Sequence, residues 1–140
     1  MSSRADAVRA SNEAFYRAFR ERDLVAMESL WAARSPVACM HPGMDAIVGR
    51  ERVLESWRGI LAHDGAPRLT CTSVEVHLLG DTAFVTCLEG TPGDPPALVA
   101  TNVFIEEDSA WRMVCHQAGP LNARTRHTAI EEPPDPRTVN

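Results

Sequence analysis

His41 follows an apolar run with the composition of a strand, residues 37–40, and Pro42 comes directly after it. Proline restricts the backbone of the residue before it, so this imidazole is held where the strand ends, at the edge of the core. The ordinary pKa of histidine lies near neutral pH, which suits a base that removes a proton next to a carbonyl group. The sequence therefore predicts His41 as a general base.

Two other side chains can supply the hydrogen bonds that such a reaction needs. The enolate formed by proton removal requires donors, and the Tyr16 hydroxyl and the Asn102 amide can each supply one. Asn102 alternates with Ala100 and Phe104 in a strand-like run, and a polar residue on an inward strand face needs a partner or a function. Tyr16 and Asn102 are thus predicted oxyanion donors, although a Tyr16 hydroxyl satisfied inside the core would be purely structural.

The remaining candidates would contact a ligand rather than transfer its proton. Trp57 offers an aromatic wall of the kind that small apolar ligands need. His116 lies on a neighbouring predicted strand and adds a second titratable group. The predicted ligand-binding set is Trp57, His116, Asn12 and Phe104. We therefore expect the partner to be a small apolar ligand that carries a carbonyl group or a similar acceptor.

Other kinds of chemistry lack their sequence signatures. Zinc requires three or four preorganised ligands, and the chain contains no H-x-H, H-x-x-x-H or C-x-x-C pair. We expect neither a metal nor a cofactor. The four cysteines, Cys39, Cys71, Cys87 and Cys115, are irregularly spaced within apolar runs, so they are predicted to be reduced and buried.

Length and composition set broad limits on the protein. A chain of 140 residues is long enough for one hydrophobic core but short for two, which predicts one domain. The net charge of −5 argues against nucleic acid as a partner, because phosphate binding needs a basic surface. No apolar run approaches the roughly 20 residues that span a bilayer, and the first residues do not resemble a signal peptide. We therefore expect a cytoplasmic protein that binds neither nucleic acid nor membrane.

Three helices are predicted from apolar residues spaced three and four apart. The first covers residues 4–22, a stretch without glycine or proline. The second begins after Asp23, which is a favourable N-cap residue, and Pro36 ends it. The third opens at Gly49 and closes at Gly65.

After residue 67 the apolar pattern changes to a period of two, which is typical of strands. Residues 120–140 are polar and proline-rich and are predicted to form a largely disordered tail. Helices followed by a run of strands indicate an α+β domain with helices on one face of a curved antiparallel sheet. The predicted strands are one short strand at 37–41 and four longer ones at 72–78, 82–89, 97–105 and 110–118.

Both faces of the last two predicted strands carry apolar side chains. Val99, Val103 and Ile105 share one face, whereas Ala100 and Phe104 share the other. Helices can cover only one face of the sheet, so the second face needs another partner. The simplest arrangement is a homodimer joined through the outer face of the sheet.

Eight blocks of residues, spread over most of the chain, share their order and spacing with one known family. They are residues 14–19, 23–24, 30–32, 39–43, 49–51, 53–57, 100–104 and 111–114. The pattern resembles the SnoaL-like branch of the NTF2-like superfamily over residues 1–119, and it leaves out the tail of residues 120–140. The resemblance implies an α+β cone, in which three N-terminal helices pack on a curved, mainly antiparallel sheet and enclose a deep pocket.

Within this superfamily the site residues resemble those of the ketosteroid isomerase branch. Tyr16 matches the oxyanion tyrosine, His41 the general base and Asn102 the second oxyanion donor, although that branch has aspartate at the last two positions. The resemblance thus implies an isomerase-, cyclase- or dehydratase-like enzyme that acts without a cofactor. The same scaffold also serves non-enzymatic proteins, so a ligand-binding module without turnover and a homodimeric assembly module both remain open.

Overall fold

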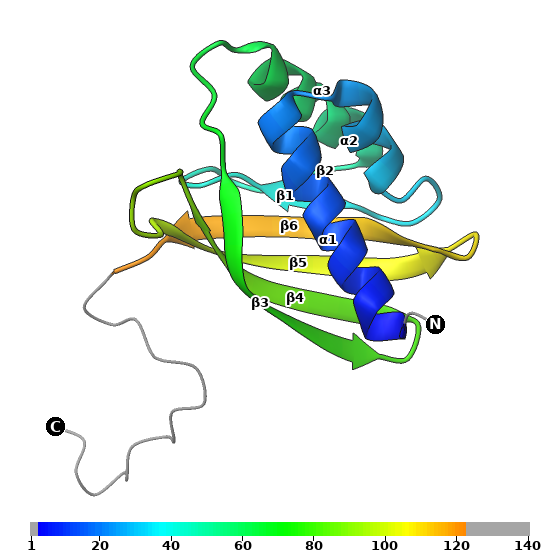
Figure 1. Ribbon diagram of the computed structural model, residues 1–140. Helices are drawn as coiled ribbons and strands as arrows, with labels where there is room; N and C mark the ends of the chain where they lie inside the picture. Colours follow the sequence, from blue (N-terminus) through cyan, green and yellow to red (C-terminus); the bar gives the residue numbers. More distant parts are fainter. Residues whose placement is uncertain (1–2, 123–140) are drawn as a thin grey trace, which may run out of the picture.

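The computed structural model describes residues 3–122 of the chain. Two helices come first, a short pair of strands and a third helix follow, and four long strands complete the fold (Figure 1). Residues 123–140, most of the predicted tail, lie outside the described residues. The elements are α1 (Arg4–Glu21), α2 (Leu24–Leu30), β1 (Ala38–Met40), β2 (Ile47–Val48), α3 (Arg50–Ala62), β3 (Thr70–Leu79), β4 (Thr82–Gly90), β5 (Leu98–Glu107) and β6 (Ala110–Pro120).

Side-chain caps start the first two helices. Ser3 accepts a hydrogen bond from the Asp6 backbone N–H, and the Asp6 side chain accepts one from the Ser3 backbone in return. Asp23 caps α2 as predicted, by accepting a hydrogen bond from the Ala26 N–H at 3.0 Å.

No helix within residues 3–122 is long and apolar enough to cross a membrane.

The second and third helices differ in how the chain enters or leaves them. Helix α2 ends at Leu30, earlier than the predicted stop at Pro36, because Trp31 leaves the helix and pairs with Met113 of β6. Helix α3 begins after Gly49, as predicted. Gly49 has a φ of 97°, which favours glycine over any residue with a side chain.

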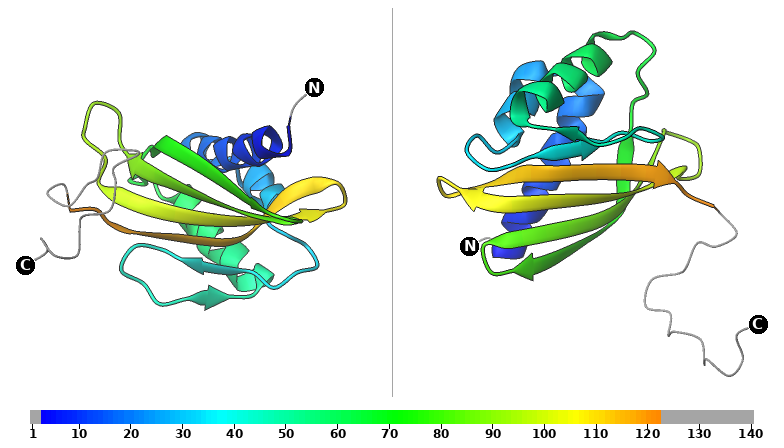
Figure 2. Two further views of the ribbon diagram at one scale, coloured as in Figure 1. Left: turned by 90° about the horizontal axis from the view of Figure 1, so that it is seen from below. Right: turned by 180° about the vertical axis from the view of Figure 1, so that it is seen from behind.

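Six strands form one sheet in the order β2-β1-β6-β5-β4-β3. Every neighbouring pair is antiparallel except β1 and β6. The three helices pack against this sheet (Figure 2), so the predicted α+β fold with a mainly antiparallel sheet is confirmed. One detail differs from the prediction, because the two-residue strand β2 was not predicted. Strand β1 lies between α2 and α3, as the predicted strand at 37–41 does, so the three helices do not form one uninterrupted block.

Aromatic side chains join the helices to one another above the sheet. Helix α1 lies across one face of the sheet (Figure 1) and buries Phe15 and Phe19. Both rings make edge contacts with Trp57 of α3, at centroid distances of 5.4 and 5.3 Å. Phe104 of β5 is fully buried on the sheet side. The core therefore lies between α1, α3 and the sheet.

A β-bulge in β6 decides which of its side chains enter the core. Met113 and Cys115 pair with consecutive residues of β5, so Val114 between them is an extra residue. Strict alternation would put Met113 and His116 on opposite faces of the sheet. The bulge shifts the alternation by one residue, and both side chains are buried. This extra residue turns His116 into the interior.

The outer face of the sheet carries apolar side chains that the helices do not cover. Phe84, Val103 and Ile105 are half-buried on this face, and Val99 is 42% exposed. Phe84 pairs directly with Val103, so apolar side chains of β4 and β5 adjoin one another. A partly exposed apolar strip therefore runs along β4 and β5.

Phe104→Ala is expected to lower the free energy of unfolding by about 3–5 kcal/mol, because removing a fully buried ring leaves a cavity. Val25→Ala is the control: Val25 is 78% exposed on α2, and its loss should change stability by less than about 0.5 kcal/mol. Chemical denaturation followed by circular dichroism measures both variants. If Phe104→Ala lowered the free energy of unfolding as little as Val25→Ala does, the placement of Phe104 in the core would be contradicted.

Candidate functional site

Five polar side chains from four elements meet in the interior beneath α1. Asn12 and Tyr16 lie one turn apart on the same face of α1, whereas Glu89, Asn102 and His116 project from β4, β5 and β6. All five are between 0% and 3% exposed. Polar groups buried this deeply need hydrogen-bond partners. We call these five side chains the polar cluster.

Hydrogen bonds run in one direction through the polar cluster. The amide nitrogen of Asn102 donates to Asn12 Oδ1 at 2.8 Å and to the Tyr16 hydroxyl at 3.1 Å. Asn102 Oδ1 therefore faces His116 and accepts from its Nδ1–H at 2.6 Å. The Tyr16 hydroxyl in turn donates to Glu89 Oε2 at 2.5 Å. The donors thus form a chain that begins at an imidazole and ends at a carboxyl group.

Tyr16 and Glu89 hold a proton between two buried oxygens. Burial raises the pKa of Glu89, and the hydrogen bond from Tyr16 partly offsets this rise. Burial, together with the neighbouring Glu89, raises the pKa of Tyr16 far above its ordinary value. The separation of 2.5 Å lies at the short end of the range for O–H···O hydrogen bonds. The phenol therefore keeps its proton and donates it to the carboxyl group.

His116 is neutral at pH 7. Burial, with a smaller contribution from repulsion by His41, lowers the pKa of His116 to about 3. Since its Nδ1 carries the proton that goes to Asn102, the lone pair of the ring lies on Nε2. The first donor of the chain is thus an uncharged imidazole.

His41 follows β1 directly and is 8% exposed. The Ser56 hydroxyl donates its one proton to the Val53 carbonyl at 2.7 Å, so at 3.0 Å it must accept from His41 Nε2–H. The lone pair of His41 therefore lies on Nδ1. Burial lowers the pKa of His41, which leaves the ring unprotonated at neutral pH, as a general base requires.

Trp57 contacts both imidazoles. Its ring centroid lies 4.9 Å from that of His41 and 5.9 Å from that of His116. Phe15 also contacts both Trp57 and His116. Within residues 3–122 the buried indole N–H of Trp57 has no well-formed hydrogen bond, and the polar group beside it is the Cys39 thiol, a weak acceptor. Trp57, the predicted aromatic wall, therefore also carries an indole N–H that could donate a hydrogen bond to a ligand.

The structure brings most of the predicted site residues together. Four of them belong to the polar cluster, and His41 and Trp57 adjoin it through ring contacts. Phe104 is fully buried but takes no part in the hydrogen-bonded chain. The four in the polar cluster are Tyr16, Asn102, His116 and Asn12.

Sequence reasoning missed Glu89, although a signal for it exists. Ala83, Val85 and Cys87 are buried at alternate positions of β4. Glu89 continues this series at the next inward position, and it is 1% exposed. The alternation of β4 thus places a carboxyl group in the interior, next to a cysteine that also touches the Tyr16 hydroxyl, at 3.3 Å.

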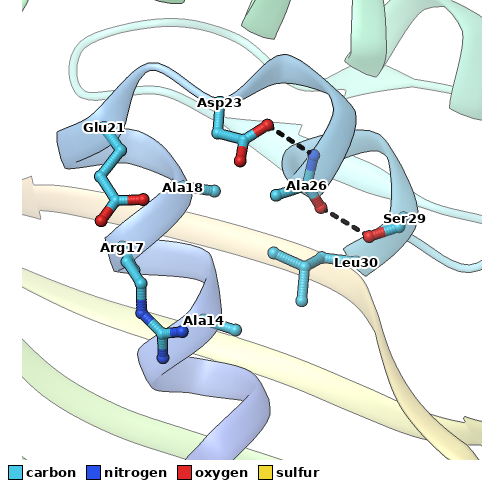
Figure 3. A pocket seen from close by; sticks show the side chains of 8 residues that line it. All are labelled: Ala14, Arg17, Ala18, Glu21, Asp23, Ala26, Ser29 and Leu30. Atoms are coloured by element: carbon cyan, nitrogen blue, oxygen red, sulfur yellow. Dashed lines mark hydrogen bonds between the residues drawn. The ribbon is translucent and has the colours of Figure 1, made fainter.

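Two hollows of the described chain lie away from the polar cluster. One of about 200 Å³ lies between α1 and α2, beside Arg17, Asp23 and Leu30 (Figure 3), and it is smaller than a usual ligand pocket. Another of about 470 Å³ lies between α2 and α3 and is lined mainly by charged side chains. The members of the polar cluster are instead packed against one another and against Phe15.

The groups of the polar cluster suit hydrogen bonding and proton exchange. The cluster and its neighbour His41 supply two neutral imidazoles, a phenol and a carboxyl group, together with two amides. Within residues 3–122, no three His, Cys, Asp or Glu side chains are grouped so that they could hold a metal ion. The arrangement can therefore move protons or bind a polar atom of a ligand.

Helices packed on a mainly antiparallel sheet, with polar side chains enclosed between the two layers, define the class of domain to which this chain belongs. Residues 8–122 match the model of the SnoaL-like domain. The chain is therefore a member of the SnoaL-like domain family, and the resemblance inferred from the eight sequence blocks is confirmed.

Two solved structures are similar to the chain over most of its length. A candidate dehydratase of the NTF2-like family from Streptomyces avermitilis is 34% identical, covers 85% of this chain and 96% of its own, and superposes with a TM-score of 0.76. A candidate calcium/calmodulin-dependent protein kinase type II association domain from Thiobacillus denitrificans is 37% identical, covers 81% of this chain and 94% of its own, and gives a TM-score of 0.67. One scaffold is thus shared by relatives with different names.

One curated relative is a longer protein. The F-box protein SKIP8 of Arabidopsis thaliana is 29% identical over 107 residues, which is 76% of this chain. The match covers only 46% of the plant protein, so the chain spans about half the length of that relative. The similarity therefore concerns one region of the plant protein.

Glu89→Gln is expected to make stability depend more steeply on pH between about 4.5 and 6.5. In this window the two histidines bind protons in the unfolded state but not in the folded state, because burial lowers their pKa. The free energy of unfolding therefore rises with pH. Folded Glu89, whose pKa burial raises from 4.5, keeps a proton that the unfolded state releases, so it opposes that rise. Its removal should steepen the slope by up to about 1.4 kcal/mol per pH unit.

Urea denaturation at a series of pH values measures the slope. Glu75→Gln is the matched control, since Glu75 is an exposed carboxylate on β3. We expect the slope of this control to equal that of the wild type. An unchanged or flatter slope in Glu89→Gln would show that the carboxyl group is not held in its neutral form by burial.

Proposed function

We propose that the protein binds a small molecule with a carbonyl group between α1 and the sheet and transfers a proton on it. The observation that carries this proposal is the directional hydrogen-bond chain from His116 to Glu89, beside the neutral His41. Burial raises the pKa of the carboxyl group and lowers the pKa of the imidazoles, a pattern typical of acid–base sites. The similar candidate dehydratase of the NTF2-like family supports a reaction of this class.

In this proposal His41 is the general base and acts through the lone pair on Nδ1. Tyr16 and Asn102 stabilise the oxyanion. In the structure these donors are engaged by Glu89 and Asn12. A substrate oxygen must therefore take the place of a Glu89 oxygen on the Tyr16 hydroxyl and of Asn12 Oδ1 on the Asn102 amide. The second amide hydrogen of Asn102 keeps the phenol oriented.

Ligand entry requires the interior to open. Phe15 and Trp57 fill the space beside the polar cluster. We propose that these rings turn aside and that the cone-like pocket of the resemblance forms between α1, α3 and the sheet. The unpaired indole N–H of Trp57 would gain an acceptor when a ligand oxygen enters, which favours the open form in the presence of ligand.

His41→Ala is expected to slow proton exchange at the carbon next to a carbonyl group by about 100-fold or more, because the general base is lost. The measurement follows deuterium incorporation by NMR, in D₂O, into a panel of small cyclic ketones, and it requires no natural substrate. Tyr16→Phe removes one oxyanion donor and should cost about 100-fold.

His63→Ala is the matched control for His41→Ala. His63 is an exposed histidine at the end of α3 and lies outside the polar cluster. This variant should exchange deuterium at the wild-type rate. Catalysis by His41 would be refuted if His41→Ala and His63→Ala were equally active, or if the wild type exchanged no faster than free imidazole.

A second candidate function is a homodimeric assembly module without turnover. The filled interior favours it, because Tyr16 and Asn102 are satisfied without a ligand. We propose that the second copy binds on the outer face of the sheet, over Val99, Val103 and the half-buried residues beside them. The 37% identity to a candidate association domain supports this role.

Val99→Glu is expected to convert a dimer into a monomer, because it places a charge on the most exposed part of the apolar strip. Val25→Glu is the matched control, since Val25 is exposed on α2, away from the sheet. Light scattering coupled to size exclusion should give twice the chain mass for the wild type and for Val25→Glu. A wild type that keeps the mass of one chain at every concentration would rule out the dimer.

A further inference from the structure

Two thiols adjoin the polar cluster and have no role in the proposed acid–base chemistry. Cys71 comes from β3 and Cys87 from the neighbouring strand β4, and both are free. Cys71 pairs with Glu89, two residues beyond Cys87 on β4, and both sulfurs contact side chains of α1, so the two thiols are diagonal neighbours on the inner face of the sheet. Cys87 is 2% exposed, whereas Cys71 is half-buried. Small solutes therefore reach this pair from the Cys71 side.

A β-bulge gives the backbone next to this pair freedom to adjust. The pairing of β3 with β4 is interrupted between Thr72 and Glu75, opposite Cys87. Within the bulge Ser73 has a φ of 54°, which is uncommon for residues other than glycine. A bulge leaves its extra residue without a ladder partner. The segment of β3 opposite Cys87 can therefore adjust while Cys71 keeps its pairing with Glu89.

The surroundings of the two sulfurs make the thiols unequal. The Tyr16 hydroxyl lies 3.3 Å from the Cys87 sulfur, and the Asn12 amide nitrogen lies 3.6 Å from the Cys71 sulfur. The neighbouring Cys71 thiol is the main cause of a lowered pKa of Cys87, and the Cys87 thiol, followed by burial, raises the pKa of Cys71. One thiol thus ionises more readily while its neighbour keeps its proton, which suits disulfide formation.

We propose that Cys71 and Cys87 form an intramolecular disulfide when the protein meets hydrogen peroxide. The Cys87 thiolate attacks a peroxide oxygen, the O–O bond breaks, and Cys87 becomes a sulfenic acid. The other oxygen leaves as hydroxide and becomes water by taking up the proton that the Cys87 thiol released. The Cys71 sulfur then attacks the sulfenic sulfur, the S–O bond breaks, and the hydroxyl group leaves as water with the Cys71 proton. In total the two thiols lose two electrons and two protons, and one peroxide gives two waters.

This disulfide would connect the oxidation state of the protein to its polar cluster. Formation of the disulfide moves the Cys71 sulfur away from the Asn12 amide and the Cys87 sulfur away from the Tyr16 hydroxyl. Asn12 then keeps its hydrogen bond with Asn102, and Tyr16 keeps those with Asn102 and Glu89. The proposal does not depend on whether the polar cluster is catalytic.

The test treats the full native chain with hydrogen peroxide and then alkylates the thiols that remain. No lysine or arginine lies between Arg68 and Arg112, so one tryptic peptide carries both cysteines and should lose the mass of two hydrogens. Cleavage after Glu75 by a glutamate-specific protease separates them and should give two linked peptides. A dithiol reductant should reverse both changes.

Variants decide which cysteines react. Cys71→Ser and Cys87→Ala should each abolish the loss of two hydrogens, with circular dichroism as the check on folding. Cys115→Ser is the matched control, since Cys115 is a half-buried cysteine on β6, and it should keep the disulfide. Four free thiols after treatment of the wild type, or a bond that involves Cys39, Cys115 or a second chain, would overturn the proposal whether or not the variants fold.

Discussion

Polar side chains enclosed in an apolar interior must find their partners inside the protein, and this requirement fixes α1 on the sheet. Contacts of apolar side chains such as Phe15 and Phe19 are not directional and tolerate sliding. The hydrogen bonds from Tyr16 to Glu89 and from Asn102 to Tyr16 do not tolerate sliding, because they need separations near 3 Å and suitable angles. A buried group that loses its partner costs about 1–3 kcal/mol. The polar cluster therefore sets the position and rotation of the helix.

The same burial governs the charges of the site. Desolvation disfavours charged forms, so it lowers the pKa of His116 and His41 and raises that of Glu89. At neutral pH the imidazoles are uncharged, and each has one protonated and one free nitrogen. Their hydrogen-bond directions follow from fixed neighbours, Asn102 for His116 and Ser56 for His41. Fold and electrostatics thus have one cause, which is the exclusion of water from the space under α1.

Periodicity in the sequence was enough to predict the helices and the long strands. The first helix begins where predicted, and Asp23 caps the second because its side chain matches a local backbone requirement. The two-residue strand β2 has too few residues to show a period. The bulge at Val114 was not predicted either, since an extra residue in one strand is visible only against its partner.

Local spacing was enough to predict which side chains of α1 face the interior. Asn12 and Tyr16 are four residues apart on a helix, so they share a face, and both reach Asn102. Glu89 continues the inward alternation of β4 but lies at the end of that strand, next to a loop. Whether the interior is hollow or filled depends on how side chains such as Phe15 and Trp57 pack, and sequence spacing does not determine that packing.

The two candidate functions need different members of the polar cluster. An assembly module needs only a fixed position of α1 on the sheet, and Asn12, Tyr16 and Asn102 would be enough for that. Their side chains are uncharged in water, so burial with hydrogen-bond partners costs little free energy. Glu89 and His116 are different, because the fold must hold each of them against its preferred charge state in water. Apolar side chains of similar size would fill the same space at a lower cost in stability. The presence of both titratable groups at the two ends of one hydrogen-bond chain therefore favours acid–base chemistry over assembly alone.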